Sequence, residues 1–250
     1  MSISIEPIGV IHSCFKQKFG IPRQAGLVPE AHAYLQLHPP YDQENFIRGL
    51  DGFSHVWIIF LFHRCERDGL KSTVRPPRLG GNRRLGVFAT RSGFRPNPIG
   101  MSAVELKKII KKDGCLRLYL RGADILDGTP VLDIKPYIPY ADAHPAAEGG
   151  FAAEPPGEGL RVEFSPEADR ACRAAEADEK NSLRKLIIRM LQYDPRPAYY
   201  DRNSGKKQFA TRIDDVDIHW KIDGTRVIVT TILPVVSRQM DSKTQNDLKL

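Results

Sequence analysis

Residues 141–160 limit the possible folds of this chain more than any other feature of its sequence. They read ADAHPAAEGGFAAEPPGEGL, which is almost entirely alanine, glycine, proline and acidic residues. Such a segment has too few large apolar side chains to pack into a core and is typical of a linker. We therefore predict a domain at residues 1–140, a linker at 141–160, a smaller domain at 161–235 and a disordered tail at 236–250.

The first domain is predicted to be mainly β. Leucine alternates with other residues from Leu116 to Leu120, shortly after the turn signal Asp113-Gly114, as in a β-hairpin. The apolar run FSHVWIIFLF, residues 53–62, has the length of a strand and is predicted to be buried on both faces. Many short strands and few helices favour an antiparallel barrel or a sandwich.

Two local features of this domain are predicted in more detail. Asp42 precedes a short helical pattern, so we expect it to be the N-cap of a helix. In VLDIKPY, Leu132 and Ile134 are predicted to face the core, while the odd-numbered residues from Val131 to Tyr137 share the opposite face.

The second domain is predicted to be a small α+β unit. Ser165 and Pro166 have the N-cap and first-position chemistry of a helix start. Alternation from Val216 to Ile222 indicates a strand. One apolar stripe with helical spacing is expected to pack on the sheet, and its members are Leu183, Leu186, Ile187, Met190 and Leu191.

The chain is basic, with a formal net charge of +7, and the excess lies in the first domain. Residues 1–140 carry 20 Lys and Arg against 12 Asp and Glu. A polyanion such as a nucleic acid would be attracted to this region, although a solvated basic surface explains the composition equally well. Residues 69–104 contain no acid and seven cations: Lys71, Arg75, Arg78, Arg83, Arg84, Arg91 and Arg95.

No feature of the sequence indicates secretion, a membrane or a metal. The N-terminus MSISIEPIGVIHS is unlike a signal peptide, and no apolar run reaches the roughly 18 residues of a membrane helix. The four cysteines are widely spaced, which favours free thiols in a reducing compartment. No HxxxH or HExxH pair occurs. We predict a soluble cytoplasmic protein without a structural metal.

Common nucleotide-binding and hydrolase motifs are absent. No GxGxxG follows a strand, no GxxxxGK[ST] occurs, and there is no GxSxG elbow. A Rossmann-type domain is therefore not expected. Any chemistry must use other loops.

Three loops have the chemistry of a binding site. IPRQAGLVP, residues 21–29, combines a flexible glycine with flanking prolines and polar donors. In RSGFRPNPIG, residues 91–100, the two prolines restrict the backbone, so little entropy remains to be lost on binding. Arg91 and Arg95 stand on that stiff support. RGADILDGTPVLDIKPY, residues 121–137, places acids at turns and strand ends.

Individual polar residues in these regions have more than one interpretation. Asp127 precedes a glycine, so ordinary turn chemistry is favoured over a functional role. His63 follows the buried run, where we favour a histidine hydrogen-bonded at a barrel rim over a site residue. Asp133 lies beside Lys135 on one face, and a surface ion pair and a site role remain equally open.

At this point several segments resemble a known family. They are IGVIHS, KFGIPRQAGLV, GFSHVWIIFLFH, TVRPPRLGGNRRLGVFATRSGFRPNPIGMS, LDGTPVLDIKPYIPY and QYDPRPAYY. These segments are similar to segments of the TrmO family of TsaA-like proteins. The match runs from about Ile5 to Leu233, in order and without large gaps. Runs as long as RPNPIG and DGTPVLDIKPY are specific.

The resemblance implies a fold and a reaction. The fold would be a small antiparallel β-barrel of the TsaA-like type, not a Rossmann domain, followed by a small α+β domain. The reaction would transfer the methyl group of S-adenosyl-L-methionine to the exocyclic nitrogen of N6-threonylcarbamoyladenosine, beside the tRNA anticodon. The cofactor would lie near a homodimer interface.

The resemblance also implies which residues bind the cofactor. Asp124 would accept hydrogen bonds from the ribose or the amino group, Arg91 would hold the carboxylate, and backbone N–H groups near Gly26 and Gly122 would read the adenine edge. The implied residues are Gln24, Ala25, Gly26, His63, Arg64, Arg91, Met101, Arg121, Gly122, Ala123 and Asp124.

For catalysis and RNA binding the sequence offers candidates. Asp133 is our candidate for a group that accepts the proton of the weakly nucleophilic acceptor nitrogen. Four rings are available to stack on an extruded base: Phe94, Tyr137, Tyr199 and Tyr200. The predicted RNA contacts are Arg75, Arg78, Arg83, Arg84, Arg196 and Tyr199.

Two other classes of function remain open. A non-catalytic RNA-binding barrel would explain the charge but not the cofactor loops. A methyltransferase acting on another substrate would bind the cofactor and leave threonylcarbamoyl-tRNA unmodified. The roles of Arg95 and Asn97 are unassigned.

Overall fold

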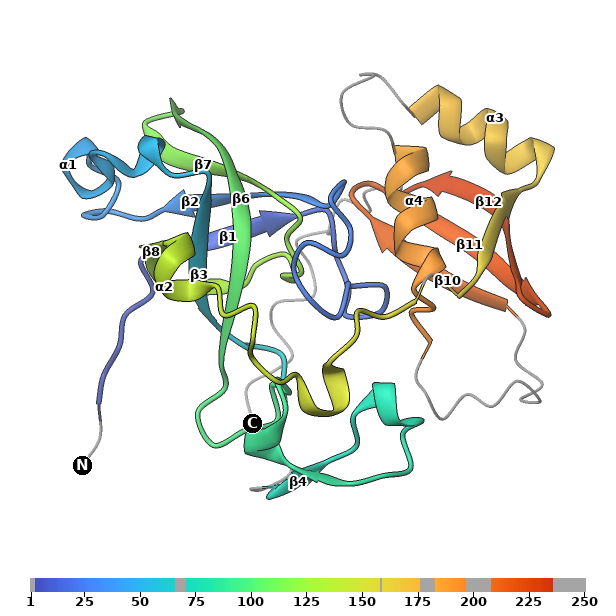
Figure 1. Ribbon diagram of the computed structural model, residues 1–250. Helices are drawn as coiled ribbons and strands as arrows, with labels where there is room; N and C mark the ends of the chain where they lie inside the picture. The colour runs from blue at the N-terminus through green and yellow to red at the C-terminus, as the bar shows by residue number, and fades with distance from the viewer. Residues whose placement is uncertain (1–2, 66–70, 158, 176–182, 197–207, 236–250) are drawn as a thin grey trace, which may run out of the picture.

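Six antiparallel strands close into a barrel in the first part of the chain (Figure 1). The structure is a computed structural model that describes residues 3–65, 71–157, 159–175, 183–196 and 208–235. The order around the barrel is β1-β2-β7-β6-β3-β8, so the sheet closes on itself. The predicted mainly β fold with an antiparallel barrel is confirmed. The strands are β1 (Gly9–Ser13), β2 (His32–Leu37), β3 (His55–Leu61), β6 (Ile99–Lys112), β7 (Cys115–Arg121) and β8 (Pro130–Pro136).

The β6–β7 hairpin forms where the alternation predicted it. Leu116, Leu118 and Leu120 of β7 all point into the barrel and are buried. Asp113 and Gly114 have φ angles of 52° and 80°, so both turn residues are left-handed, as the Asp-Gly signal requires.

The expectation that the run at residues 53–62 is buried on both faces is wrong. In β3, Val56 and Ile58 fill the barrel, whereas Trp57 and Ile59 are only partly buried on its outer surface. A closed barrel has a single interior, so a strand can pair with β6 and β8 on both edges and still bury only one face.

The predicted facing of β8 is wrong at its start. Val131 is fully buried, and Leu132, predicted to face the core, is only partly buried. The cause is a bulge in the pairing with β3, where Phe60 lies opposite Val131 and the preceding Ile59 lies opposite Asp133. Leu132 is the extra residue. Beyond the bulge, Ile134 packs against the core as predicted.

The short helix near residue 42 starts later than expected. Helix α1 (Glu44–Ile47) has Gln43 as its N-cap, and no side chain caps it by a hydrogen bond. The prediction of Asp42 as N-cap is therefore wrong. In a helix of a single turn, the sequence pattern does not determine which of two neighbouring residues is the N-cap.

The second part of the chain is a four-stranded sheet with two helices. The sheet order is β10-β11-β12-β9, and the two helices pack on one side of it (Figure 1). Ser165 Oγ accepts a hydrogen bond from the Ala168 N–H at 3.1 Å, which confirms the predicted N-cap. The elements are β9 (Arg161–Phe164), α3 (Pro166–Ala175), α4 (Leu183–Gln192), β10 (Gln208–Ile213), β11 (Val216–Asp223) and β12 (Arg226–Pro234).

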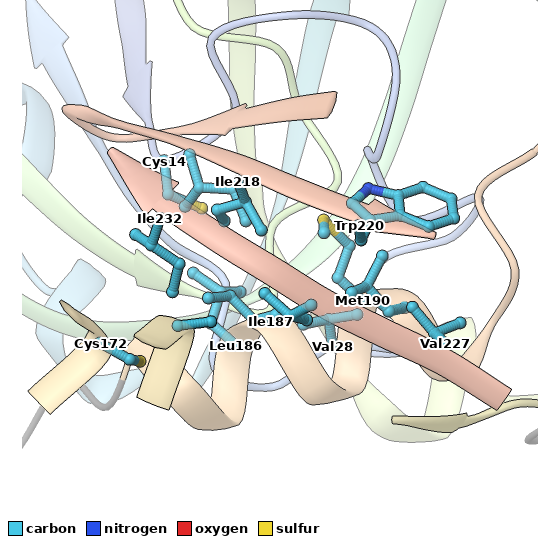
Figure 2. Packing of buried hydrophobic residues seen from close by; sticks show 14 of the residues in the cluster. Cys14, Val28, Cys172, Leu186, Ile187, Met190, Ile218, Trp220, Val227 and Ile232 are labelled. Atoms are coloured by element: carbon cyan, nitrogen blue, oxygen red, sulfur yellow. The ribbon is translucent and has the colours of Figure 1, made fainter. Parts of the chain in front are cut away.

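The predicted apolar stripe of α4 packs against this sheet. Leu186, Ile187, Met190 and Leu191 are almost completely buried, and Leu183 contacts the same cluster. Figure 2 shows Leu186, Ile187 and Met190 packed with side chains of β11 and β12. The prediction of an α+β unit is confirmed.

Two smaller regions lie outside the barrel and the four-stranded sheet. A short β-ribbon, β4 (Thr73–Val74) with β5 (Leu85–Gly86), carries the loop 75–84. Residues 139–155, which begin with helix α2 (Pro139–Asp142), are exposed and cover most of the predicted linker. The predicted disordered tail, residues 236–250, lies outside the described residues.

All four cysteines are free thiols, as predicted. In the part of the chain that the structure describes, no helix is long and apolar enough to span a membrane. Within those same residues, no cluster of His, Cys, Asp and Glu has the arrangement of a metal site.

Candidate functional site

Two of the three predicted loops pack directly on each other at one end of the barrel. The Gly26 N–H donates to the Gly122 carbonyl at 2.9 Å, and the Gly122 N–H donates to the Ala31 carbonyl at 2.7 Å. Gly122 has a φ of 72°, and a Cβ there would lie 3.4 Å from the Gly26 Cα. A Cβ would therefore fit at this contact, and it is the left-handed backbone of Gly122 that favours glycine here.

Asp124 is the centre of this contact. Its Oδ1 accepts a hydrogen bond from Ser102 Oγ at 2.6 Å, and its carboxylate also accepts one from the backbone N–H of Ala25. Arg91 attracts it electrostatically. Burial nevertheless raises the pKa of the Asp124 carboxyl above its ordinary value, because desolvation outweighs these stabilising contacts.

Arg91 joins the third loop to the first. Its Nη1 donates to Gln24 Oε1 at 2.5 Å. Through these two side chains the loop 91–100, called the proline loop below, meets the loop 21–29, called the PRQAG loop. The residue as a whole is exposed. Arg91 and Asp124 thus place a cation and an anion at one junction, which suits a zwitterionic ligand.

His63 and Arg64 follow β3 in a turn that packs against the proline loop. The Phe62 N–H donates to the Pro98 carbonyl at 2.7 Å, and a Cβ on Gly93 would lie 2.6 Å from Cys65 Sγ. Lys18 Nζ contacts the Arg64 carbonyl, which ties the same turn to the segment that carries PRQAG.

The charge state of His63 follows from its surroundings. Burial lowers the pKa of its imidazole below the ordinary value, and the nearby charges of Arg64 and Lys18 lower it further. A hydrogen bond with the Leu61 backbone acts in the opposite direction. His63 is therefore neutral at pH 7, as expected for a histidine at a barrel rim.

The remaining predicted cofactor residues surround this junction in different ways. Ala123 is buried in the barrel core, so only its backbone is available to a ligand. Arg121 Nε donates to the Pro29 carbonyl at 2.8 Å and so holds the end of the first loop. Met101 is 55% exposed and lies on the outer face of β6, opposite Ile59 of β3.

Asp133 lies in the same row of the outer face as Met101. Ile59 pairs with Met101 on one side and with Asp133 on the other. Asp133 forms an ion pair with Lys135 at 3.0 Å, with 49% of its side chain exposed. The surface ion pair, one of the two interpretations of Asp133, is therefore present.

The structure assigns a structural role to Arg95. Its Nη1 donates to the carbonyls of Thr90 at 3.2 Å and Ser92 at 3.5 Å, so it braces the proline loop from inside. Asn97 is exposed, and its carbonyl accepts from the Ile99 N–H at 2.7 Å. Phe94 of the same loop is 46% exposed.

The predicted RNA contacts of the first domain lie together on the loop between β4 and β5. Arg75, Arg78, Arg83 and Arg84 are all exposed. Arg78 contacts the Glu154 carbonyl, and Arg84 Nη1 donates to Thr73 Oγ1 at 3.1 Å. Arg75 and Arg83 project from the same loop.

The predicted RNA contacts of the second domain are less simple. The Arg196 guanidinium forms two hydrogen bonds with the Asp194 carboxylate, both at 2.7 Å, and only 13% of its side chain is exposed. The fork uses two of the five N–H donors of the guanidinium, and the burial of this side chain limits the access of a phosphate to the other three. Tyr199 and Tyr200 lie outside the described residues. Tyr137 is partly buried beside Trp57, with ring centroids 5.7 Å apart.

Sequence reasoning missed two residues that support the site, Ser102 and Lys18. Ser102 is a buried hydroxyl between Gly100 and Val104, which also point into the barrel. A polar residue at an inward position of an otherwise apolar strand was the available signal. Lys18 had no signal, because its contact depends on how the loop folds back.

Comparison with known proteins gives a consistent result. The model for "tRNA-methyltransferase O N-terminal domain" matches residues 10–143, and that for "TrmO C-terminal domain" matches residues 157–235. The chain is 46% identical to the tRNA (adenine(37)-N6)-methyltransferase of Escherichia coli K12 over 221 residues, 88% of this chain and 94% of that protein. It is 50% identical over 220 residues to a putative S-adenosylmethionine-dependent methyltransferase, RcsF, of Pseudomonas aeruginosa, 88% of this chain and 93% of that protein.

Solved structures agree. A crystal structure of TrmO from Pseudomonas aeruginosa superimposes with a TM-score of 0.76 at 42% identity, covering 94% of this chain and 98% of that one. Both family models, the relatives over most of their length and this structure converge on one assignment. The chain belongs to the TrmO family.

Proposed function

We propose that this protein is an S-adenosyl-L-methionine-dependent methyltransferase that modifies the exocyclic nitrogen of adenosine 37 in tRNA. The observation that carries the proposal is the convergence of Gln24, Gly26, Arg91, Gly122 and Asp124 at one end of a barrel that lacks any Rossmann fingerprint. The relatives that match over most of this chain carry that activity in their names.

The chemistry of the junction fits this cofactor. Arg91 would bind its carboxylate, and Asp124 would accept from a ribose hydroxyl or an amino group. Asp124 is already oriented by Ser102 and Ala25, so little reorganisation is required. When bound, the cofactor supplies an electrophilic methyl group, and the residues around it contribute mainly by positioning.

Two measurements test the proposed function. Isothermal titration should show binding of S-adenosylmethionine, which a purely RNA-binding barrel would lack. Mass spectrometry of tRNA nucleosides should detect the methyl group on threonylcarbamoyladenosine in cells that carry the gene and not in cells that lack it. Binding of the cofactor without that loss would indicate another substrate.

The acceptor in this proposal is the urea-like nitrogen of N6-threonylcarbamoyladenosine, a weak nucleophile. Asp133, in one row with Ile59 and Met101, is the candidate that accepts its proton. With bound tRNA, Asp133→Ala is expected to slow the single-turnover methyl transfer by about 100-fold, the size typical of general base catalysis. A full single-turnover rate in this variant would eliminate Asp133.

Cofactor binding should depend on pH through His63. Because its pKa is lowered, the imidazole gains a proton at a lower pH than an ordinary histidine does. The added charge would repel the sulfonium, so affinity should fall as the pH decreases through the lowered pKa of His63. Titration calorimetry of His63→Gln should show a smaller fall at low pH. Any fall in affinity that remains in this variant would come from protonation of Asp124, whose carboxyl has a raised pKa.

A homodimer and a tRNA-binding surface complete the proposal. Phe94, Ile99 and Met101 expose large apolar side chains beside the site, which supports an interface between two copies there. Analytical ultracentrifugation measures this oligomeric state directly.

The arginines of the loop 75–84 would bind tRNA phosphates. With tRNA as its substrate, the protein would act in the cytoplasm.

A further inference from the structure

The loop that carries Gln24, Ala25 and Gly26 is built largely on the second domain. Residues 14–31 leave the barrel after β1 and return to it as β2. Within that segment, Cys14, Phe15, Val28 and Ala31 are at most 1% exposed, and all four belong to the hydrophobic cluster of α4 and the β9–β12 sheet. Figure 2 shows Cys14 and Val28 among the side chains of that cluster.

Hydrogen bonds fix the first end of this segment to the second domain. The Asp214 N–H, in the β10–β11 turn, donates to the Cys14 carbonyl at 2.8 Å. Phe15 forms a β-bridge with Ile213. The segment therefore continues the second sheet for a short distance before it turns back.

Aromatic packing holds the next part of the segment. The Phe19 ring lies parallel to Trp220, with centroids 6.0 Å apart and an interplanar angle of 2°, and 6.2 Å from Phe209. Gly20 follows with a φ of 100°, and a Cβ there would lie 2.6 Å from Thr211 Cγ2. The backbone thus passes so close to β10 that only glycine fits.

A polar contact comes next, immediately before the cofactor residues. Arg23 Nη2 donates to the Arg196 carbonyl at 3.1 Å, and Asp194 attracts the same guanidinium electrostatically. Asp194 and Arg196 hold each other through their own forked pair. The segment 194–196 therefore presents a fixed acceptor to Arg23.

The site contacts begin one residue later. Gln24 accepts from Arg91, the Ala25 N–H donates to Asp124, and the Gly26 N–H donates to Gly122. The loop is thus held by the second domain through residues 19–23 and by the barrel through residues 24–26.

We propose that the second domain positions the cofactor loop, with Arg23 as the positioning residue that transmits its constraint from residues 194–196 to the loop residues 24–26. This inference rests on the proposed function of those residues. Folding of the second domain orders the loop in advance, so less entropy is lost when the cofactor binds. Residues 194–196 then act on the cofactor site without contact with the cofactor.

The test compares cofactor affinity with turnover in the full-length protein. Arg23→Met removes the donor and keeps the aliphatic stem. It should raise the dissociation constant and KM for S-adenosylmethionine by about tenfold, while kcat at saturating cofactor stays within about twofold. Arg23→Lys keeps a donor and should recover most of the affinity. Hydrogen exchange of the amides at residues 20–29 should be faster in Arg23→Met.

A matched control removes an arginine elsewhere on the same sheet. Arg212 of β10 forms an exposed pair with Asp217, at 2.8 Å and 2.9 Å. Arg212→Met should leave cofactor affinity and exchange of residues 20–29 unchanged. Wild-type affinity in Arg23→Met would overturn the inference, and so would an equal loss in Arg212→Met.

Failure of this inference is separable from failure of the proposed site. Gln24→Ala and Asp124→Asn are measured in parallel with S-adenosylmethionine itself. If both bind it as the wild type does, the assigned cofactor site is wrong and the inference falls with it. If both bind weakly and Arg23→Met binds normally, the site stands and only the positioning role is lost.

Discussion

Asp124→Asn is expected to weaken binding of S-adenosylmethionine by about 10- to 100-fold. A hydrogen bond to a charged acceptor contributes about 1.5–3 kcal/mol, and each 1.4 kcal/mol is a factor of about ten in affinity. The asparagine also cannot match the carboxylate as an acceptor for two donors. Titration calorimetry at pH 7 measures the loss.

The same substitution should change the stability of the cofactor-free protein very little. Because burial raises the pKa of the Asp124 carboxyl, the folded protein binds more protons than the unfolded chain between the ordinary carboxyl value and the raised one. The free energy of unfolding therefore decreases as pH rises through that range, and it stays lower at neutral pH. Asparagine removes this penalty, which offsets the lost hydrogen bond.

Thermal melting separates these two effects. The Tm of Asp124→Asn without cofactor should stay within about 4 °C of the wild type, a difference of about 1 kcal/mol for a protein of this size. A cofactor concentration that saturates the wild type should raise this Tm much less than it raises the Tm of the wild type. A normal cofactor-induced rise in Tm would show that Asp124 is not a ligand.

Asp127→Asn is the matched control on the same loop. The Asp127 carboxylate accepts from the Ser13 N–H at 2.9 Å and pairs with Lys16 at 3.1 Å, so it supports the strand β1. This variant should lose stability and keep cofactor affinity. The opposite pattern in the two variants distinguishes a binding carboxylate from a structural one.

Local signals in the sequence predicted those elements whose geometry is set by neighbouring residues. The Asp113-Gly114 turn and the leucines of β7 define a hairpin without reference to the rest of the chain. The stripe of α4 and the Ser165 cap are local in the same sense. Each of these predictions depends only on a repeat or a turn type.

The wrong predictions concern features that arise when the barrel closes. The bulge between β3 and β8 decides that Val131 is buried and Leu132 is not, and nothing in VLDIKPY marks it. The outer face of β3 is exposed because a closed sheet has no second layer there. Register and closure are properties of the whole sheet, so a single strand does not encode them.

The residues of the candidate site were proposed mostly through resemblance and only partly through chemistry. The three loops stood out because of their glycines, prolines and arginines, and two of them meet at Asp124 and Gly122. The sequence did not show that Arg91 contacts Gln24 whereas Arg95 contacts the backbone of its own loop. This difference depends on which guanidinium turns inward. Attachment of residues 14–31 to the second core was equally hidden, since its apolar residues follow no period.

The second large effect is expected from the arginine loop at residues 75–84. Arg75→Gln with Arg83→Gln should lower tRNA affinity by about tenfold or more at low salt. Each phosphate contact adds about 0.7–0.9 to the slope of log affinity against log salt, so the slope should become shallower by about 1.4–1.8. Binding measured from about 50 to 200 mM salt detects this change.

These two positions are chosen because of the contacts of their neighbours. Arg78 and Arg84 already contact Glu154 and Thr73, and their removal would also disturb the loop and the linker. Arg75 and Arg83 are exposed on the same loop. Affinity for S-adenosylmethionine should therefore stay unchanged in the double variant, which separates RNA binding from the cofactor site.

A charge-matched control decides whether position or total charge matters. Arg48→Gln with Lys112→Gln removes the same two charges from exposed positions beside α1 and at the β6–β7 turn, away from the β4 loop in Figure 1. If only the net charge of the chain attracted tRNA, both pairs would lower the affinity equally. A loss confined to Arg75 and Arg83 would identify the loop as the tRNA contact, whereas an unchanged salt slope would remove it from the interface.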